Sequence, residues 1–232
     1  MDVKTLEHEY AVAKTTDNFS QHQQFIKKLL STDDPDVVDY HYRMLAVRDN
    51  RDLYLRLRAA FKKREDVAVR FLVSKIKVEQ DPKLRNDILH LLGGLRSQEA
   101  APLAREFLSH QSPEDRHIGC YVIGWVGTEN DIHLLGDRLL NDPDPRVRET
   151  AATAHDQIMI RLPETKNRLL GNLKAALEKE KNENVIPWII ITIQYIMKKG
   201  FGLKENIEEA TWSGSVERAR VKAMKALELI ES

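Results

Sequence analysis

The chain of 232 residues is 42% hydrophobic and 31% charged, and its 36 Lys and Arg residues balance 36 Asp and Glu residues. This composition is too apolar for a disordered chain and too charged for a membrane protein. The longest apolar run, residues 185–197, is interrupted by Pro187 and Gln194. It falls short of the roughly 20 residues that span a bilayer.

Cysteine content and the N-terminal segment indicate a compartment. The single cysteine, Cys120, cannot form an internal disulfide, which favours a reducing environment. Residues 1–14 lack the apolar core of a secretory signal. We therefore expect a cytoplasmic protein without a membrane segment.

Amphipathic stretches follow one another along the chain and predict helices. After an expected N-terminal cap at 1–19, residues 20–47 predict two helices joined by a turn, and residues 49–64 predict a further helix. Helix pairs with short polar turns come next. Their first helices are expected at residues 64–76, 97–108 and 130–140. Residues 163–200 predict one more pair, and residues 203–232 are expected to form a C-terminal cap.

An arginine recurs near the start of the second helices. Apolar or small residues follow it mostly at +3, +4, +6, +7 and +10, a spacing that marks one helix face. The first three arginines lie 31 and 32 residues apart, so the pattern repeats. The four arginines of this column are Arg85, Arg116, Arg148 and Arg220. Prolines at the first turn, with Asp81, Ser112 and Asp144 beside them as N-caps, predict where three of these helices begin.

One segment has two possible structures. The β-branched run 189–193 could form a buried strand by propensity alone, but its place as the second helix of a pair favours a helix, and the most buried one. No segment alternates between polar and apolar residues over a useful length, so we expect no sheet.

The motif D-P-D-P-x-V-R-x-x-A-A-x-A at residues 142–154 resembles the HEAT repeat, in its PBS-lyase-like form. The resemblance covers roughly residues 20–231 and is strongest at 80–160. It departs where His155 and Asp156 replace the usual Leu-Gly, and where the first unit has no arginine. It implies an all-α fold: an α–α superhelix, a right-handed solenoid of stacked antiparallel helix pairs. We expect a single domain over residues 1–232 with about six helix pairs.

The arginine column has two interpretations. It could be a ladder for a polyanion, or each arginine could bond a turn carboxylate such as Asp81, Asp115 or Asp144 in its own or the adjacent unit. Because the column belongs to the repeat itself, we favour the architectural interpretation. Small residues at Gly119, Cys120, Ala151 and Ala152 are expected to let neighbouring helices approach closely.

Candidate contacts for a partner lie at helix positions that the core does not claim. The resemblance implies that the second helices line a concave face. On these helices Tyr121 and Trp125 are four residues apart and thus adjacent, so they could anchor a partner or merely fill a narrow groove. Trp212 is expected to pack under the C-terminal cap. The partner-binding candidates are Arg43, His90, Tyr121, Trp125, Thr153, Gln157, Tyr195 and Lys225.

Charge is uneven although its total is zero. Residues 43–77 hold eleven Lys and Arg against four Asp and Glu, while residues 1–42 are acidic. A basic segment suits an acidic protein surface or a nucleic acid, and it could also be a solvated helix with its own carboxylate partners. The predicted basic patch comprises Arg51, Arg56, Arg58, Lys62, Lys63 and Arg64.

The sequence contains no catalytic constellation. Its eight histidines are scattered, no pair has zinc-protease spacing, and Cys120 lies in the apolar pattern of a helix. We expect no metal, no cofactor and no enzyme activity. The leading hypothesis is a scaffold that binds another protein, and a bacterial regulatory or toxin-neutralising (immunity) protein fits the small size. The alternatives are nucleic-acid binding, including an alkylated-base DNA glycosylase, and a tetrapyrrole lyase or chaperone, which rests on the resemblance alone.

Overall fold

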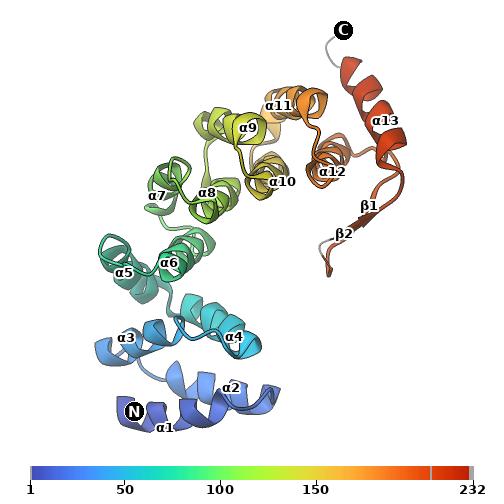
Figure 1. Ribbon diagram of the computed structural model, residues 1–232. Helices are drawn as coiled ribbons and strands as arrows, with labels where there is room; N and C mark the ends of the chain where they lie inside the picture. Colours follow the sequence, from blue (N-terminus) through green and yellow to red (C-terminus); the bar gives the residue numbers. More distant parts are fainter. Residues whose placement is uncertain (1, 210, 230–232) are drawn as a thin grey trace. The chain divides into compact units, whose positions relative to one another are not determined.

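The computed structural model describes residues 2–209 and 211–229. Contacts between Cα atoms divide the chain into two compact units, Met1–Glu99 and Ala100–Ser232, each built from antiparallel helices (Figure 1). The predicted all-α helical repeat is confirmed. None of the described helices is both long and apolar enough to cross a membrane.

The N-terminal unit consists of α1 (Val3–Ala13), α2 (Phe19–Leu29), α3 (Pro35–Met44), α4 (Arg51–Phe61), the 3-10 turn η1 (Lys62–Arg64), α5 (Glu65–Ile76) and α6 (Pro82–Gly94). Side chains of Asp2, Asn18, Asp34, Asn50 and Asp81 cap five of these helices, each accepting a backbone N–H of the first turn. These caps explain why the helices begin where they do.

Helix α4 is not the extra helix that the sequence suggested. It packs against α3 as the second helix of a pair, and it also contacts α2 and α6. Its apolar face contributes Leu53, Leu57 and Phe61 to the core. The ring of Phe61 is fully buried and meets His41 edge-on at 4.8 Å between centroids. The pairing therefore begins at α1, and residues 1–19 contain the first helix of a pair.

The C-terminal unit consists of α7 (Ala100–Phe107), α8 (Pro113–Val126), η2 (Glu129–Asp131), α9 (Ile132–Asn141), α10 (Pro145–Arg161), η3 (Pro163–Thr165), α11 (Lys166–Lys179), α12 (Val185–Met197), β1 (Lys204–Asn206), β2 (Thr211–Ser213) and α13 (Val216–Glu228). Asp144 and Ser112 cap α10 and α8, with a proline in the first turn of each, as predicted.

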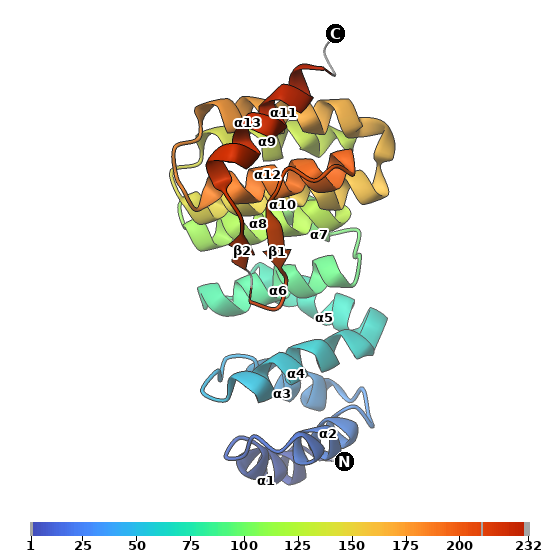
Figure 2. The same cartoon turned by 90° about the vertical axis from the view of Figure 1, so that its right-hand side faces the viewer.

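The helices of this unit form two layers. Helix α10 packs between α8 and α12, while α9 packs against α11 (Figures 1 and 2). Close approach of α7 and α8 depends on Gly119, where a Cβ atom would lie 3.0 Å from the carbonyl oxygen of Ala104. Nine of the thirteen residues of α12 are buried, so the run 189–193 forms a helix. We name the surface of α8, α10 and α12 that faces away from α9 and α11 the second-helix face.

A short antiparallel ribbon corrects the expectation that no sheet would form. Lys204 pairs with Ser213, Glu205 with Trp212 and Asn206 with Thr211. Three-residue strands are too short to produce a recognisable period of two in the sequence. After the ribbon Gly214, with φ of 120°, approaches the carbonyl of Gly202 so closely that a Cβ atom would clash, and the chain then turns into α13.

Candidate functional site

Arg116 joins two consecutive helix pairs. Its Nε and Nη2 donate to the carboxylate of Asp142 at 2.7 and 2.8 Å, while Nη1 donates to the carbonyls of His110 and Gln111 in its own turn. The Asp142 side chain is fully buried at the end of α9. Burial raises the pKa of Asp142, but bonds from Arg116 and from the backbone outweigh it and leave the pKa lowered. The pair is therefore ionised inside the fold.

Arg148 repeats this arrangement one unit later. It donates to Glu180 at 2.7 and 3.2 Å and to the carbonyls of Asp142 and Pro143. Glu180 ends α11 as Asp142 ends α9, each in an extended conformation. Arg220 on α13 donates to the carbonyls of Leu177 and Glu180. The partners of Arg116 and Arg148 are thus carboxylates that end the next unit's first helix, rather than Asp115 or Asp144.

Arg64 has a comparable place in the N-terminal unit and does not belong to an exposed basic patch. Its side chain is 1% exposed. The guanidinium donates to Asp33 at 2.6 Å and to the carbonyls of Leu29 and Thr32, and its Nε reaches His41. This role has no signal in the sequence, because Arg64 precedes α5 and lies outside the repeated arginine pattern.

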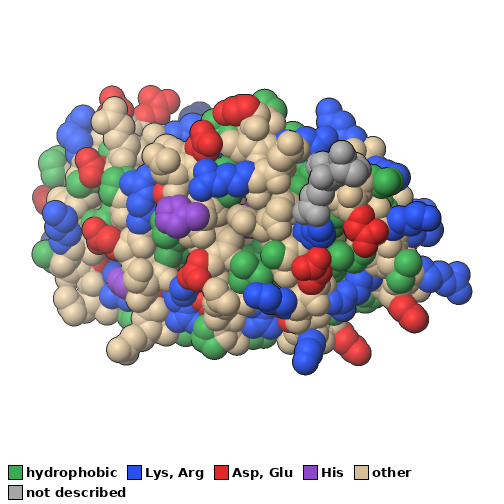
Figure 3. All heavy atoms as spheres, turned by 90° about the horizontal axis from the view of Figure 1, so that it is seen from above, with side chains coloured by type: hydrophobic (Ala, Val, Ile, Leu, Met, Phe, Trp, Pro, Cys, Tyr) green, Lys and Arg blue, Asp and Glu red, His purple; other side chains and the backbone are tan. Residues whose placement is uncertain are grey.

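The remaining basic candidates differ in their partners. Arg56 pairs with Asp52 at 3.6 Å, and its guanidinium carbon lies 4.6 Å from the ring centroid of Phe19. Arg51 and Lys63 are exposed, while Lys62 is half-buried. On the face seen from above in Figure 3, Lys and Arg side chains lie among Asp and Glu side chains.

Tyr121 and Trp125 form an aromatic pair on α8. Their ring centroids are 4.6 Å apart with an interplanar angle of 62°, and both side chains are half-buried. The core face of the same helix is occupied by Cys120, Val122 and Ile123, which are fully buried. The pair therefore lies at the margin between the core and solvent.

Helix α10 places polar side chains beside this pair. His117 on α8 and Thr150 on α10 are bonded at 2.7 Å, which fixes the two helices side by side. Further along, the Oε1 of Gln157 is buried over Gly124 and has no hydrogen-bond partner within the described residues. Thr153 is half-buried and donates to the carbonyl of Thr150. Small and polar residues thus continue the surface that the aromatic pair begins.

Tyr195 on α12 contacts the ribbon. Its side chain is 48% exposed, and its hydroxyl donates to Glu205 at 2.6 Å. This bond raises the pKa of Tyr195 to about 12. Burial and the charge of Glu205 raise the pKa of Asp156 on α10. Trp212, opposite Glu205 in the ribbon, is half-buried.

A cluster in the N-terminal unit was not predicted as a group. Asp87 on α6 is 5% exposed and accepts from Arg48 at 2.7 Å, Tyr54 at 2.6 Å and Arg58 at 3.4 Å. His90 follows one turn later, and burial with the charges of Arg58 and Lys62 lowers its pKa to about 4. We name Arg48, Tyr54, Arg58 and Asp87 the Asp87 cluster.

Two other candidates lie outside both groups. Arg43 is exposed on α3 and pairs with Asp39 at 3.0 Å. Lys225 is exposed on α13. Neither takes part in the Asp87 cluster or in the aromatic pair.

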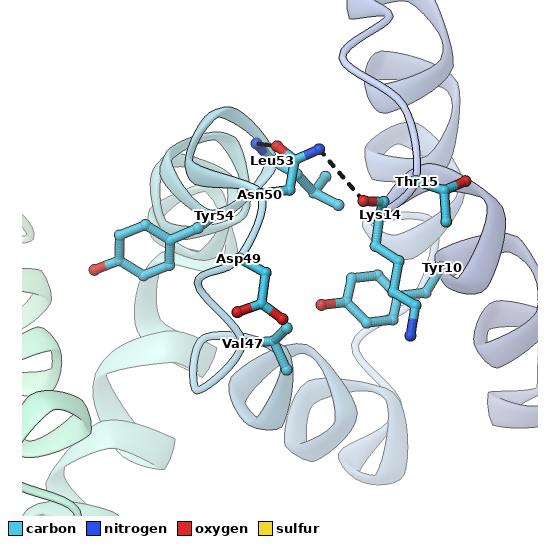
Figure 4. Close-up of a pocket in the computed structure, with 8 residues that line it drawn as sticks. All are labelled: Tyr10, Lys14, Thr15, Val47, Asp49, Asn50, Leu53 and Tyr54. Carbon is cyan, nitrogen blue, oxygen red and sulfur yellow. Dashed lines mark hydrogen bonds between the residues drawn. The ribbon is translucent and has the colours of Figure 1, made fainter.

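A cavity of about 190 Å³ lies in the N-terminal unit between the end of α1 and the loop before α4 (Figure 4). The hydroxyl of Tyr10 points toward Asp49 across it, while the ring of Tyr54 points away. Asn50 closes one side by donating to the carbonyl of Thr16 at 2.9 Å. The cavity is smaller than the roughly 300–1,000 Å³ of typical small-molecule sites.

Nucleophiles and metal ligands do not assemble within the described residues. They contain no group of three or more His, Cys, Asp or Glu that could hold a metal ion. Cys120 is fully buried, and burial raises the pKa of its thiol, so it has no thiolate character.

In comparison with protein families, residues 69–156 match the family model for HEAT repeats. The matched segment runs from α5 to α10 and includes three arginines of the column. A search of curated proteins gave no match. HEAT repeats generally serve as scaffolds for protein–protein interaction, and the all-helical fold is typically non-enzymatic.

Proposed function

We propose that this protein is a non-enzymatic scaffold that binds a partner protein through the second-helix face of its C-terminal unit, since residues 69–156 match the HEAT-repeat family model. The partner-facing residues would be Tyr121, Trp125, Thr153, Gln157 and Tyr195. A cytoplasmic bacterial regulator or a toxin-neutralising protein would act in this way.

The aromatic pair carries the proposal. Tyr121 and Trp125 keep part of their surface exposed, whereas Cys120, Val122 and Ile123 on the same helix are fully buried. Half-buried Tyr and Trp side chains supply a large contact area at low entropic cost, and they are enriched among residues that dominate binding energy. The rings already contact each other, so little ordering is needed when a partner binds.

Nucleic-acid binding is less well supported. Arg56 and Arg43 each have a carboxylate partner of their own, and Arg64 is buried. A phosphate backbone requires several cations that remain available to successive phosphates. The tetrapyrrole alternative gains no support from the geometry.

We expect Tyr121→Ala and Trp125→Ala to weaken capture of a partner by the full chain from an extract of its host. Each truncation should cost about 2 kcal/mol of binding free energy, or about 30-fold in affinity, if the ring is an anchor. Helicity by circular dichroism should stay close to the original. Phe19→Ala, which removes an aromatic ring that is 60% exposed in the other unit, is the matched control and should leave capture unchanged.

The opposite outcome assigns the rings to the core. Both variants would then lose about 2–5 kcal/mol of unfolding free energy, as buried aromatic truncations do, and binding would change only with the folded fraction. Equal capture by the stable variants and by the original chain would reject the proposed face.

A further inference from the structure

We propose that Arg48 and Arg58 form an anchor for a carboxylate side chain in an acidic peptide segment of the partner protein. The anchor lies on the N-terminal unit, within the Asp87 cluster. The inference rests on the proposed function in assuming a protein partner, but it does not depend on the aromatic pair.

Asp87 fixes the positions of both guanidinium groups. One carboxylate oxygen accepts from Arg48 at 2.7 Å, and the other accepts from the Tyr54 hydroxyl at 2.6 Å and from Arg58 at 3.4 Å. The Asp87 side chain is 7% exposed, whereas those of Arg48 and Arg58 are 30% and 26% exposed. The Asp87 carboxylate is therefore buried, and the guanidinium groups of Arg48 and Arg58 extend from it to the surface.

Tyr54 provides a second constraint. The guanidinium carbons of Arg48 and Arg58 lie 5.0 and 5.5 Å from the centroid of its ring. Stacking on an aromatic ring fixes the plane of a guanidinium while leaving N–H groups at its edge free to bond. Two arginines held in this way lose little side-chain entropy when an anion binds.

Arg48 and Arg58 keep N–H donors that their contacts within the protein do not use. A guanidinium carries five N–H groups. Arg48 uses donors toward Asp87 and the carbonyl of Leu45, and Arg58 uses one toward Asp87. Within the described residues no further acceptor meets either group. Unused N–H groups on a planar fork match the two oxygens of a carboxylate.

The charge of the site is positive, because two arginines share one carboxylate. Lys62 adds to the positive charge of this region, since its charge and that of Arg58 both lower the pKa of His90. His90 therefore stays neutral at pH 7 and adds no charge. Arg48, Arg58 and Asp87 together have a net positive charge. The carboxylate of one acidic side chain from the partner would neutralise it.

A peptide carboxylate fits the surroundings better than a nucleic acid. The neighbouring cations Arg56, Arg43 and Lys75 have carboxylate partners at 3.6, 3.0 and 2.9 Å. The unsatisfied donors are thus concentrated at one point instead of along a row, whereas a nucleic acid presents a charge at every phosphate. The site is suited to one carboxylate, with peptide on either side.

The test uses the full chain and a fluorescein-labelled ten-residue peptide of alternating Glu and Ser, with the Gln–Ser peptide as neutral counterpart, read by fluorescence anisotropy. The original chain should bind the Glu peptide and not the Gln peptide. Arg48→Gln and Arg58→Gln should each weaken binding by about tenfold. Arg43→Gln removes the same charge from an exposed side chain on α3 in the same unit and should change affinity by less than about twofold.

Arg48→Lys distinguishes a fork from a point charge. It keeps the positive charge, so a loss of about fivefold or more supports recognition by the planar group, and unchanged affinity contradicts it. Circular dichroism of each variant reports whether the unit stays folded. If the Arg48 variants unfold, Arg58→Lys applies the same comparison on α4.

Three outcomes would overturn the anchor: equal losses in Arg43→Gln and Arg48→Gln, no binding of the Glu peptide, or tighter binding of a ten-nucleotide single-stranded DNA that depends on Arg48. If the Glu peptide does not bind while Tyr121→Ala and Trp125→Ala still weaken partner capture, the proposed function stands and the anchor alone is rejected. If capture is insensitive to the aromatic variants but peptide binding depends on Arg48, the anchor stands alone.

Discussion

Replacing Arg116 by alanine should lower the unfolding free energy by about 3–5 kcal/mol, because it leaves the fully buried carboxylate of Asp142 with one guanidinium partner fewer. Arg138 still reaches Asp142, at 3.2 Å, so the acid retains a single weaker ion pair. The carbonyls of His110 and Gln111 lose their donor in the same variant. A typical domain is stable by only 5–15 kcal/mol, so the C-terminal unit should be severely weakened.

Urea unfolding followed by circular dichroism measures this effect. Arg168→Ala is the control, since Arg168 and Glu129 are 45% and 64% exposed and 3.7 Å apart, and exposed pairs contribute about 0–1 kcal/mol. A loss in Arg116→Ala no greater than that in Arg168→Ala would show that the buried pair has little structural value. It would reopen the interpretation of the arginine column as a ligand-binding ladder.

The repeated pattern predicted helices well because its signals are local. A proline in the first turn beside a capping Asp or Ser fixed where α6, α8 and α10 begin. In the run 189–193 the β-branched residues favour a strand by propensity, but the run forms a helix that is buried on most sides, as its place in the helix pair predicts. The ribbon of β1 and β2 has no signal in the sequence, because strands of three residues are too short to show a period of two.

Long-range partners could not be read from the same pattern. The expectation of a turn carboxylate in the same or the adjacent unit holds for Arg116, but the acid it reaches is Asp142, which ends the first helix of the next unit. Arg64 performs a comparable task outside the pattern altogether. The stacking of the units determines which carboxylate an arginine reaches. The spacing of residues along the sequence does not predict this stacking.

The aromatic pair and the Asp87 cluster also differ in how far the sequence predicts them. Tyr121 and Trp125 are four residues apart on one helix, so their contact followed from helical geometry. The Asp87 cluster joins residues 29 to 39 positions apart, from α4, α6 and the loop between α3 and α4. The sequence identified Arg58 as a basic residue but gave no reason to connect it with Arg48 through a shared carboxylate.

Lowering the pH from 7.5 to 5 should destabilise the fold by about 4 kcal/mol through His41 and His155, about 2 kcal/mol for each. Both imidazoles are fully buried. Burial and the charge of Arg64 lower the pKa of His41 to about 3, and burial lowers that of His155 to about 4. The unfolded chain takes up these protons near pH 6.5 while the folded chain does not. Stability is therefore complete above pH 6.5 and is lost as the pH falls toward the folded values.

Hydrogen bonds explain why neither ring accepts a proton. His155 contacts the carbonyl of Ala151 through Nδ1 at 2.6 Å, so this nitrogen donates, and Nε2 accepts from the amide of Asn172 at 3.2 Å. His41 donates from Nε2 to the carbonyl of Leu57 at 3.0 Å, and its Nδ1 accepts from Arg64. Protonation of His155 Nε2 would place an N–H against the amide donor of Asn172. Protonation of His41 Nδ1 would place an N–H against the guanidinium of Arg64, which is also a cation.

His155→Gln tests this account by the pH dependence of the unfolding free energy rather than by its value at one pH. The variant should lose about 2 kcal/mol less than the original chain between pH 7.5 and 5, because a glutamine does not titrate. His133→Gln removes an exposed imidazole and should keep the original dependence. Measurements stop at pH 5, since Asp142 and Glu180, whose pKa values are lowered, would lose their contribution in stronger acid. An unchanged pH dependence in His155→Gln would contradict the assignment of His155 as a neutral acceptor.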